Sequence, residues 1–180
     1  MMITIQPITT TDHDLLTPLT ELYEQAFPDY ERRDTKKLIQ LVADEDRFSC
    51  LALMNDGQFV GFFTQWNLDL FYYGEHFAIC EDVRGKRLGS EAAKVILADL
   101  EKPLILEVEL PTDEWSARRI EFYKKVGFEL STEHYMQPPY EENFDFIPMQ
   151  LMEYGGTLTQ THFPTIVKTL HSEIYGIKIA

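Results

Sequence analysis

Residues 75–90 read EHFAICEDVRGKRLGS. The stretch begins as an apolar strand, continues as a short basic loop and ends at the start of a helix. Backbone N–H groups at a helix N-terminus attract anions, and the helix dipole strengthens this attraction. Gly85 and Gly89 allow the backbone to approach a ligand closely, and the loop adds three positive side chains: Arg84, Lys86 and Arg87. The stretch indicates either a site for a phosphate-bearing ligand or a plain solvated turn.

The chain before this stretch predicts two helices and a run of strands. Apolar residues recur at helical spacing in residues 12–26 and 34–42, with N-caps expected at residues 10–12 and at Asp34. The expected strands cover residues 2–7, 48–54, 58–70 and 71–80. The turn Asn55-Asp56-Gly57 between two of them predicts a hairpin, because these residue types tolerate positive φ.

The chain after it predicts the same mixture. We expect helices over residues 91–100, 115–126 and 163–175, and strands over residues 104–110, 128–136 and 144–152. Gly127 is the expected C-cap of the second of these helices. The order of elements indicates an α+β fold, and 180 residues favour one domain.

Composition narrows the class of partner. The net charge is −14, from 16 Lys and Arg against 30 Asp and Glu. Binding to a nucleic-acid backbone or an anionic membrane surface needs a basic footprint, so neither partner is expected. Cys50 and Cys80 lie in apolar strands and are expected to be reduced core thiols. With neither a signal peptide nor a membrane span recognised, we expect a cytoplasmic protein.

Two segments together resemble the GNAT superfamily of acetyltransferases. Residues 84–89 are similar to its signature R/Q-x-x-G-x-G/A, with Arg84 in the first position, Gly89 in the last and Arg87 in place of the middle glycine. Residues 118–128, RRIEFYKKVGF, resemble the family's helix that ends in Y-x-x-x-G-F. The spacing fits neither a Walker A loop nor a dinucleotide-binding G-x-G-x-x-G.

The resemblance implies a fold and a co-substrate. It implies the GNAT fold, with a central mixed, mostly antiparallel sheet of about seven strands flanked by helices. The acetyltransferase domain is expected to cover residues 1–152, and residues 153–180 a C-terminal extension whose helix packs on that domain. Acetyl-CoA is the expected acetyl donor, held by these residues: Phe77, Ala78, Ile79, Arg84, Gly85, Lys86, Arg87, Leu88, Gly89, Ser90, Ser116 and Arg119. Ser116 stands where the family often has Asn, and Arg87 is expected to take ordinary helical dihedrals.

The resemblance also implies catalytic roles. Tyr123 matches the family's tyrosine near the CoA sulfur and is the candidate general acid, although its spacing alone fits a core residue. Glu75 is the candidate base or the anchor of the acceptor amine, because by the period of two it shares a strand face with residues 73, 77 and 79. His76 points to the other face and is expected to be structural.

Acceptor-binding residues are expected after the first helix and at the turn Pro138-Pro139-Tyr140. They are Tyr30, Glu31, Arg32 and Tyr140, with Trp66 also expected in the acceptor pocket. The predicted function is N-acetylation of a small-molecule amine by direct attack in a ternary complex. A protein or peptide N-acetyltransferase and a non-catalytic acyl-CoA-binding regulatory module are the alternatives. A ping-pong route through Cys80 is disfavoured because no His is placed to activate it, and no metal is expected. The acceptor and any homodimer are left open.

Overall fold

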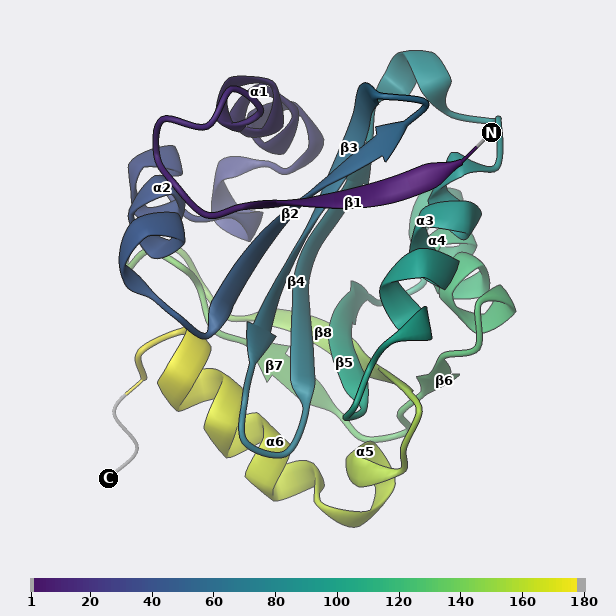
Figure 1. The fold of residues 1–180 in the computed structure, drawn as a ribbon. Helices are drawn as coiled ribbons and strands as arrows, with labels where there is room; N and C mark the ends of the chain where they lie inside the picture. Colours follow the sequence, from purple (N-terminus) through teal and green to yellow (C-terminus); the bar gives the residue numbers. More distant parts are fainter. Residues whose placement is uncertain (1, 178–180) are drawn as a thin grey trace. The chain divides into compact units, whose positions relative to one another are not determined.

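The computed structural model describes residues 2–177. They divide into two compact units, with the boundary between Glu101 and Lys102. Each unit contains both helices and strands (Figure 1). None of the described helices combines the length and the apolar character needed to cross a membrane.

The first unit is built on an antiparallel sheet in the order β1-β2-β3-β4. Its strands are β1 (Ile3–Ile8), β2 (Phe48–Asn55), β3 (Gln58–Asn67) and β4 (Tyr72–Ile79). The predicted hairpin is confirmed, because Asp56 and Gly57 both have positive φ, 49° and 81°. One irregularity matters for function. The register moves from Thr64↔His76 to Gln65↔Gly74, so β4 carries one extra residue, a β-bulge, at Glu75.

Three helices cover this sheet, α1 (Leu16–Ala26), α2 (Thr35–Asp44) and α3 (Leu88–Ala98). Figure 1 shows α1 and α2 together beside the strands, and α1 packs on β3 and β4. Tyr23 of α1 meets the rings of Phe62 and His76 at 6.1 and 4.9 Å. The other face packs on α3 through the buried cluster Ile3, Leu53, Val60, Leu88 and Ala92. The sheet therefore has one helical layer on each face.

Two helix starts in this unit differ from the prediction. α1 begins at Leu16 rather than at residue 12, because His13 accepts the Leu15 and Leu16 N–H groups at 3.1 and 2.9 Å and holds residues 10–15 in turns. α3 begins at Leu88 rather than at residue 91. The N-cap of α2 is as predicted, since the Asp34 side chain accepts the Lys36 N–H at 2.9 Å.

The second unit pairs β8 (Ile147–Tyr154) antiparallel with β5 (Leu104–Glu109), β6 (Glu129–Leu130) and β7 (Tyr135–Gln137). The single strand expected over residues 128–136 is therefore two short strands. α4 (Glu114–Lys125) ends before Gly127, whose φ of 104° confirms the predicted cap. Glu107 pairs with Leu151, and Tyr135 pairs with Met149, so these side chains share one sheet face.

The C-terminal part of this unit is more irregular than the single helix predicted over residues 163–175. It consists of a short turn of helix, α5 (Leu158–Thr161), then α6 (Phe163–Thr169), then a π-helical turn, η3 (Leu170–Ile174). Ile166, Leu170 and Ile174 are buried, which fixes the segment to its unit. Each unit has four strands among the described residues. Together with the helices, these strands form the α+β mixture that the sequence predicted.

Candidate active site

The basic loop between β4 and α3 has a strained backbone. Arg87, the N-cap of α3, has φ 61° and ψ 9°, a left-handed conformation, and Gly85 has φ 82°. The expectation of ordinary helical dihedrals at Arg87 was therefore wrong. A side chain in this region costs about 1–2 kcal/mol relative to the right-handed helix. The backbone thus keeps the path that a glycine would take without strain, although the residue is arginine.

The same loop offers a site for an anion. The N-cap of α3 makes no side-chain hydrogen bond, so no side chain of the cap satisfies the first N–H groups of the helix. Arg84, Gly85, Lys86 and Arg87 are exposed, while the Leu88 side chain is 2% exposed and belongs to the core. Arg84 Nε donates to the Ile79 carbonyl at 3.1 Å, which ties the loop to the end of β4. These features suit a pyrophosphate group.

The bulge in β4 separates residues that the sequence placed on one face. Phe77 and Ile79 pack with the cluster under α3. Tyr73 pairs with Trp66 and lies on the His76 side, because the extra residue interrupts the alternation. The prediction that residues 73, 75, 77 and 79 share a face was therefore wrong, because Tyr73 pairs with Trp66 and the Glu75 carboxylate accepts from the same Trp66.

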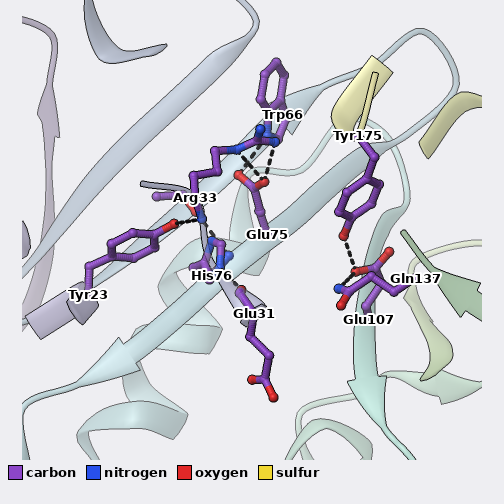
Figure 2. A network of polar contacts seen from close by, with 10 residues as sticks. Tyr23, Glu31, Arg33, Trp66, Glu75, His76, Glu107, Gln137 and Tyr175 are labelled. Atoms are coloured by element: carbon purple, nitrogen blue, oxygen red, sulfur yellow. Dashed lines mark hydrogen bonds and ion pairs between the residues drawn. The ribbon is translucent and has the colours of Figure 1, made fainter. Parts of the chain in front are cut away.

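Glu75 lies in a charged network (Figure 2). Its side chain is 0% exposed, and Oε1 accepts from Arg33 Nη2 at 2.8 Å and from Nε at 3.1 Å. Trp66 Nε1 donates to Oε2 at 3.0 Å, and the Arg33 guanidinium lies 5.6 Å from the centre of the Trp66 ring. Sequence reasoning missed Arg33, which lies 42 residues away from Glu75 in the chain.

Charges around Glu75 control its ionisation. Burial opposes the charged form, but the positive charge of Arg33, the neighbouring His76 and the hydrogen bonds from Trp66 and Arg33 outweigh it, so the pKa of Glu75 is lowered. Burial lowers the pKa of His76, against the opposing charge of Glu75. His76 Nε2 is 3.0 Å from the Glu31 carbonyl oxygen. The network thus contains an ionised carboxylate and a neutral imidazole at neutral pH.

The residues expected to bind the acceptor after α1 are partly built into this network. Tyr30 and Glu31 belong to the short 3-10 helix η1 (Asp29–Glu31), and Tyr30 is 46% exposed. Arg32 donates to the Phe27 carbonyl at 3.0 Å and forms an ion pair with Asp29. Tyr23 accepts the Arg33 backbone N–H at 2.8 Å. Arg32 thus fastens the turn after α1, and Tyr30 is left at the surface.

Tyr123 lies near the end of α4 in the second unit. Its ring packs against Phe122 at 5.2 Å and Phe128 at 5.3 Å. None of the described residues forms a hydrogen bond with its hydroxyl. Burial raises the pKa of Tyr123 to about 12, so the hydroxyl keeps its proton at neutral pH. A protonated phenol without a partner can donate to a ligand.

Two further residues expected at the co-substrate have other contacts. Ser116 is 3% exposed and forms a capping box with Asp113, since Asp113 Oδ1 accepts the Ser116 N–H at 2.8 Å and Ser116 Oγ accepts the Asp113 N–H at 3.2 Å. Arg119 Nη1 lies 2.6 Å from Glu109 Oε2. Ser116 therefore fixes the start of α4.

A second carboxylate network lies around Glu107 of β5, and the sequence did not predict it. Tyr135 donates to Oε1 at 2.5 Å, and Oε2 accepts from Tyr175 at 2.7 Å and from the Gln137 amide. Figure 2 shows Gln137 and Tyr175 directed at this carboxylate. Tyr140 lies with its ring 5.0 Å from that of Tyr175. The alternation of residues 135 and 137 was the one signal for this network in the sequence.

The cysteines and possible metal ligands add no further chemistry. Cys50 is buried, and burial raises the pKa of its thiol to about 12. Cys80 is partly exposed, and burial is also the main cause that raises its pKa. Among residues 2–177, no group of three His, Cys, Asp or Glu side chains could hold a metal ion.

Comparison with known proteins places these features in a family. The model of the acetyltransferase (GNAT) family matches residues 15–128, more than half of the 180 residues. A structure from Bacteroides thetaiotaomicron, assigned to acetyltransferases of the GNAT family, is 36% identical, with a TM-score of 0.93 over 97% of this chain and 99% of that one. No curated protein sequence matches.

Two more distant structures share the fold. The ribosomal-protein-S18-alanine N-acetyltransferase of Escherichia coli is 22% identical, with a TM-score of 0.60 over 85% of this chain and 93% of that one. An aminoglycoside 6'-N-acetyltransferase complexed with coenzyme A is 15% identical, with a TM-score of 0.61 over 83% and 95%. The expected fold is confirmed, and the chain belongs to the GNAT family of acetyltransferases.

Proposed function

We propose that this acetyltransferase moves the acetyl group of acetyl-CoA to the amine of a small molecule by direct attack in a ternary complex. The observation that carries the proposal is the Tyr123 hydroxyl, which is protonated at neutral pH and forms no hydrogen bond with the described residues. An acidic chain, with a net charge of −14, raises the local concentration of cationic amines.

The residues of the loop and of β4 would bind the donor. The N–H groups at the start of α3 and the side chains of Arg84, Lys86 and Arg87 would hold its pyrophosphate. Backbone groups of residues 77–79 would pair with its pantetheine arm as an added strand does, and one N–H would stabilise the oxyanion. These residues orient the thioester and leave the chemistry to the groups beside it.

Tyr123 would act as the general acid. The C–N bond to the acceptor forms, the C–S bond of the thioester breaks, and the departing sulfur takes the proton of the Tyr123 hydroxyl. The proton that the acceptor amine loses returns through solvent to the tyrosine. The net result is one acetylated amine and one free thiol.

For Glu75 we propose a positioning role. A carboxylate that accepts from both Arg33 and Trp66, and whose pKa is lowered, is a weaker base than an ordinary glutamate. We propose that Glu75 holds Arg33 and the turn after α1 in place, and that the turn in turn presents Tyr30, Glu31 and Arg32 to the acceptor.

Release of free thiol from acetyl-CoA tests the proposal against amines, aminoglycosides, amino acids and short peptides. Tyr123→Phe should lower kcat about 100-fold, the usual size of a general-acid contribution, and leave the Kd for CoA within twofold. Tyr154→Phe is the matched control, because it removes a hydroxyl from a neighbouring ring stack, 5.6 Å from Phe128.

Three results would redirect the assignment. Turnover confined to peptides would indicate a protein acetyltransferase. CoA binding without turnover on any amine would indicate a regulatory module. Equal kcat values for Tyr123→Phe and Tyr154→Phe would remove Tyr123 from the mechanism.

A further inference from the structure

The β-bulge in β4 directs two consecutive side chains to the same segment of the chain. In a regular strand, Glu75 and His76 would point to opposite faces of the sheet. Here Glu75 accepts from Arg33 Nη2 at 2.8 Å, and His76 Nε2 lies 3.0 Å from the Glu31 carbonyl oxygen (Figure 2). The extra residue of the bulge therefore brings both side chains to the turn between α1 and α2.

This turn, residues 29–33, is the segment that we propose presents the acceptor-binding residues. Helix α1 holds it from one side, since the Tyr23 hydroxyl accepts the Arg33 N–H at 2.8 Å and Arg32 Nε donates to the Phe27 carbonyl at 3.0 Å. Strand β4 holds it through the two residues of the bulge. A change in the geometry of the bulge would therefore move the turn.

A buried hydroxyl on the neighbouring strand β3 fixes the bulge. The Thr64 side chain is 0% exposed, and its Oγ1 accepts the backbone N–H of His76 at 3.1 Å. This hydrogen bond lies where the register moves from Thr64↔His76 to Gln65↔Gly74. A buried N–H group without a partner is costly, so the hydroxyl stabilises this register over one without the bulge.

The residue type at position 64 is more specific than the strand requires. Phe62, Phe63 and Trp66 of β3 are also buried, and all three are aromatic. Valine suits a strand as well as threonine does, and a buried hydroxyl is unfavourable unless it is hydrogen-bonded. The bond to the His76 N–H supplies that partner, which gives the threonine a purpose that valine could not serve.

We propose that Thr64 is a positioning residue for the acceptor: its hydroxyl fixes the bulge, and the bulge directs Glu75 and His76 to the turn that receives the acceptor. The inference rests on the proposed acetyl transfer and adds a residue that acts through residues 75 and 76. Residues 77–79, which would bind the donor, pair regularly with residues 61–63 beyond the bulge. Loss of the hydroxyl should therefore affect the acceptor more than the donor.

A matched pair of variants tests the role of the hydroxyl. Thr64→Val keeps the shape of the side chain and removes the acceptor atom, whereas Thr64→Ser keeps the hydroxyl. For the amine that turns over fastest in the thiol-release assay, Thr64→Val should raise KM about 5-fold to 30-fold, because fewer molecules hold the competent bulge. The Kd for CoA should stay within about twofold, and Thr64→Ser should restore the acceptor KM to within about threefold of wild type.

Trp66 reports the state of the bulge without turnover. Its indole Nε1 donates to Glu75, and the other of the two tryptophans, Trp115, is 73% exposed. Trp115→Phe therefore assigns the Trp66 N–H resonance in the proton NMR spectrum. A hydrogen bond to a carboxylate is strong and moves this resonance downfield. Thr64→Val should move it upfield, and Thr64→Ser should leave it in place.

A packing control separates positioning from a general loss of stability. Cys50 lies opposite Thr64 on β2 and is 2% exposed. Cys50→Ala leaves a small cavity beside Thr64 but keeps the hydroxyl, so the acceptor KM should stay within about twofold of wild type. Should Thr64→Val fail to fold, Thr64→Cys serves instead, because a thiol is a weak acceptor.

The outcomes distinguish this inference from the proposed function. An unmoved Trp66 resonance in Thr64→Val overturns the inference whatever the protein acetylates. An unchanged acceptor KM in Thr64→Val, or an equal rise in Cys50→Ala, overturns it and leaves the function intact. A moved resonance in Thr64→Val supports the link from Thr64 to Glu75 even if the wild type acetylates no amine, a result that would count against the proposed function.

Discussion

Glu75 and Glu107 are both carboxylates held by several donors, yet they are held by different chemistry. Glu75, in the first unit, is completely buried and accepts from the charged Arg33 and from Trp66. Glu107, in the second unit, is partly exposed and accepts from two tyrosines and an amide. A buried ion pair has a structural role, because removing either partner leaves the other as an uncompensated buried charge. The hydrogen bonds that Glu107 accepts from Tyr135, Tyr175 and Gln137 come from neutral donors, so each is weaker than the charge-assisted bonds between Arg33 and Glu75.

The largest predicted effect tests this difference through stability. Glu75→Gln leaves the Arg33 guanidinium, 14% exposed, without its charge partner and should lower the free energy of unfolding by about 3–5 kcal/mol. Glu107→Gln keeps one oxygen, which can still accept from Tyr175 and Gln137, and should cost about 1 kcal/mol. Urea unfolding of both variants measures the two values. Equal losses would show that the two networks are alike, and the comparison would fail.

The sequence predicted the features that depend on neighbours in the chain. The turn at Asp56 and Gly57, the Asp34 cap and the Gly127 cap all follow from local backbone preferences. The basic loop before α3 was found in the same way.

The features that depend on distant residues were not predicted. Glu107 meets Tyr175, 68 residues away, and no spacing rule links them. The β-bulge at Glu75 adds one residue to a strand, and the periodicity of the sequence alone does not reveal it. Arg87 has a left-handed backbone, although arginine prefers negative φ. The path of the loop determines this conformation, and the residue type does not predict it. Tyr140 was expected at the acceptor, but the ring beside it belongs to a segment that the resemblance did not reach.

Acid should weaken the network around Glu75 and His76. Burial lowers the pKa of His76 in the folded state, so the unfolded chain binds the proton more readily. Stability from this residue is complete above about pH 6.5, the unfolded value, and is lost as pH falls toward the folded pKa, at up to about 1.4 kcal/mol per pH unit. Glu75, whose pKa is also lowered, adds a further loss below about pH 4.5.

Two histidine variants sharpen this contrast. His76 is 4% exposed, whereas His171 is partly exposed, although burial lowers the pKa of both. We expect His76→Gln to flatten the dependence of the unfolding free energy on pH between 7 and 5.5, and His171→Gln to flatten it less. Urea unfolding at several pH values gives the two slopes. A steeper slope in His76→Gln than in the wild type would contradict the sign of the shift.

The Tyr175 hydroxyl tests how firmly the neutral donors hold Glu107. Tyr175→Phe removes one hydrogen bond at a partly exposed position and should cost about 1 kcal/mol of unfolding free energy. Tyr154→Phe, also in the second unit, should cost less. A loss as large as that of Glu75→Gln would mean that the Glu107 network, too, is primarily structural.

The smallest predicted effect concerns Arg87, whose left-handed backbone is a source of strain in the first unit. Arg87→Gly should relieve the left-handed backbone and stabilise the protein by about 0.5 kcal/mol, because the greater freedom of glycine in the unfolded chain offsets part of the gain. Arg87→Ala removes the same charge but keeps the strain, so it should not stabilise. If the charge helps to hold the pyrophosphate, both variants should weaken CoA binding by a similar factor, measured by calorimetry. Unequal losses of CoA affinity would show that backbone shape, rather than charge, is what this arginine contributes to the loop.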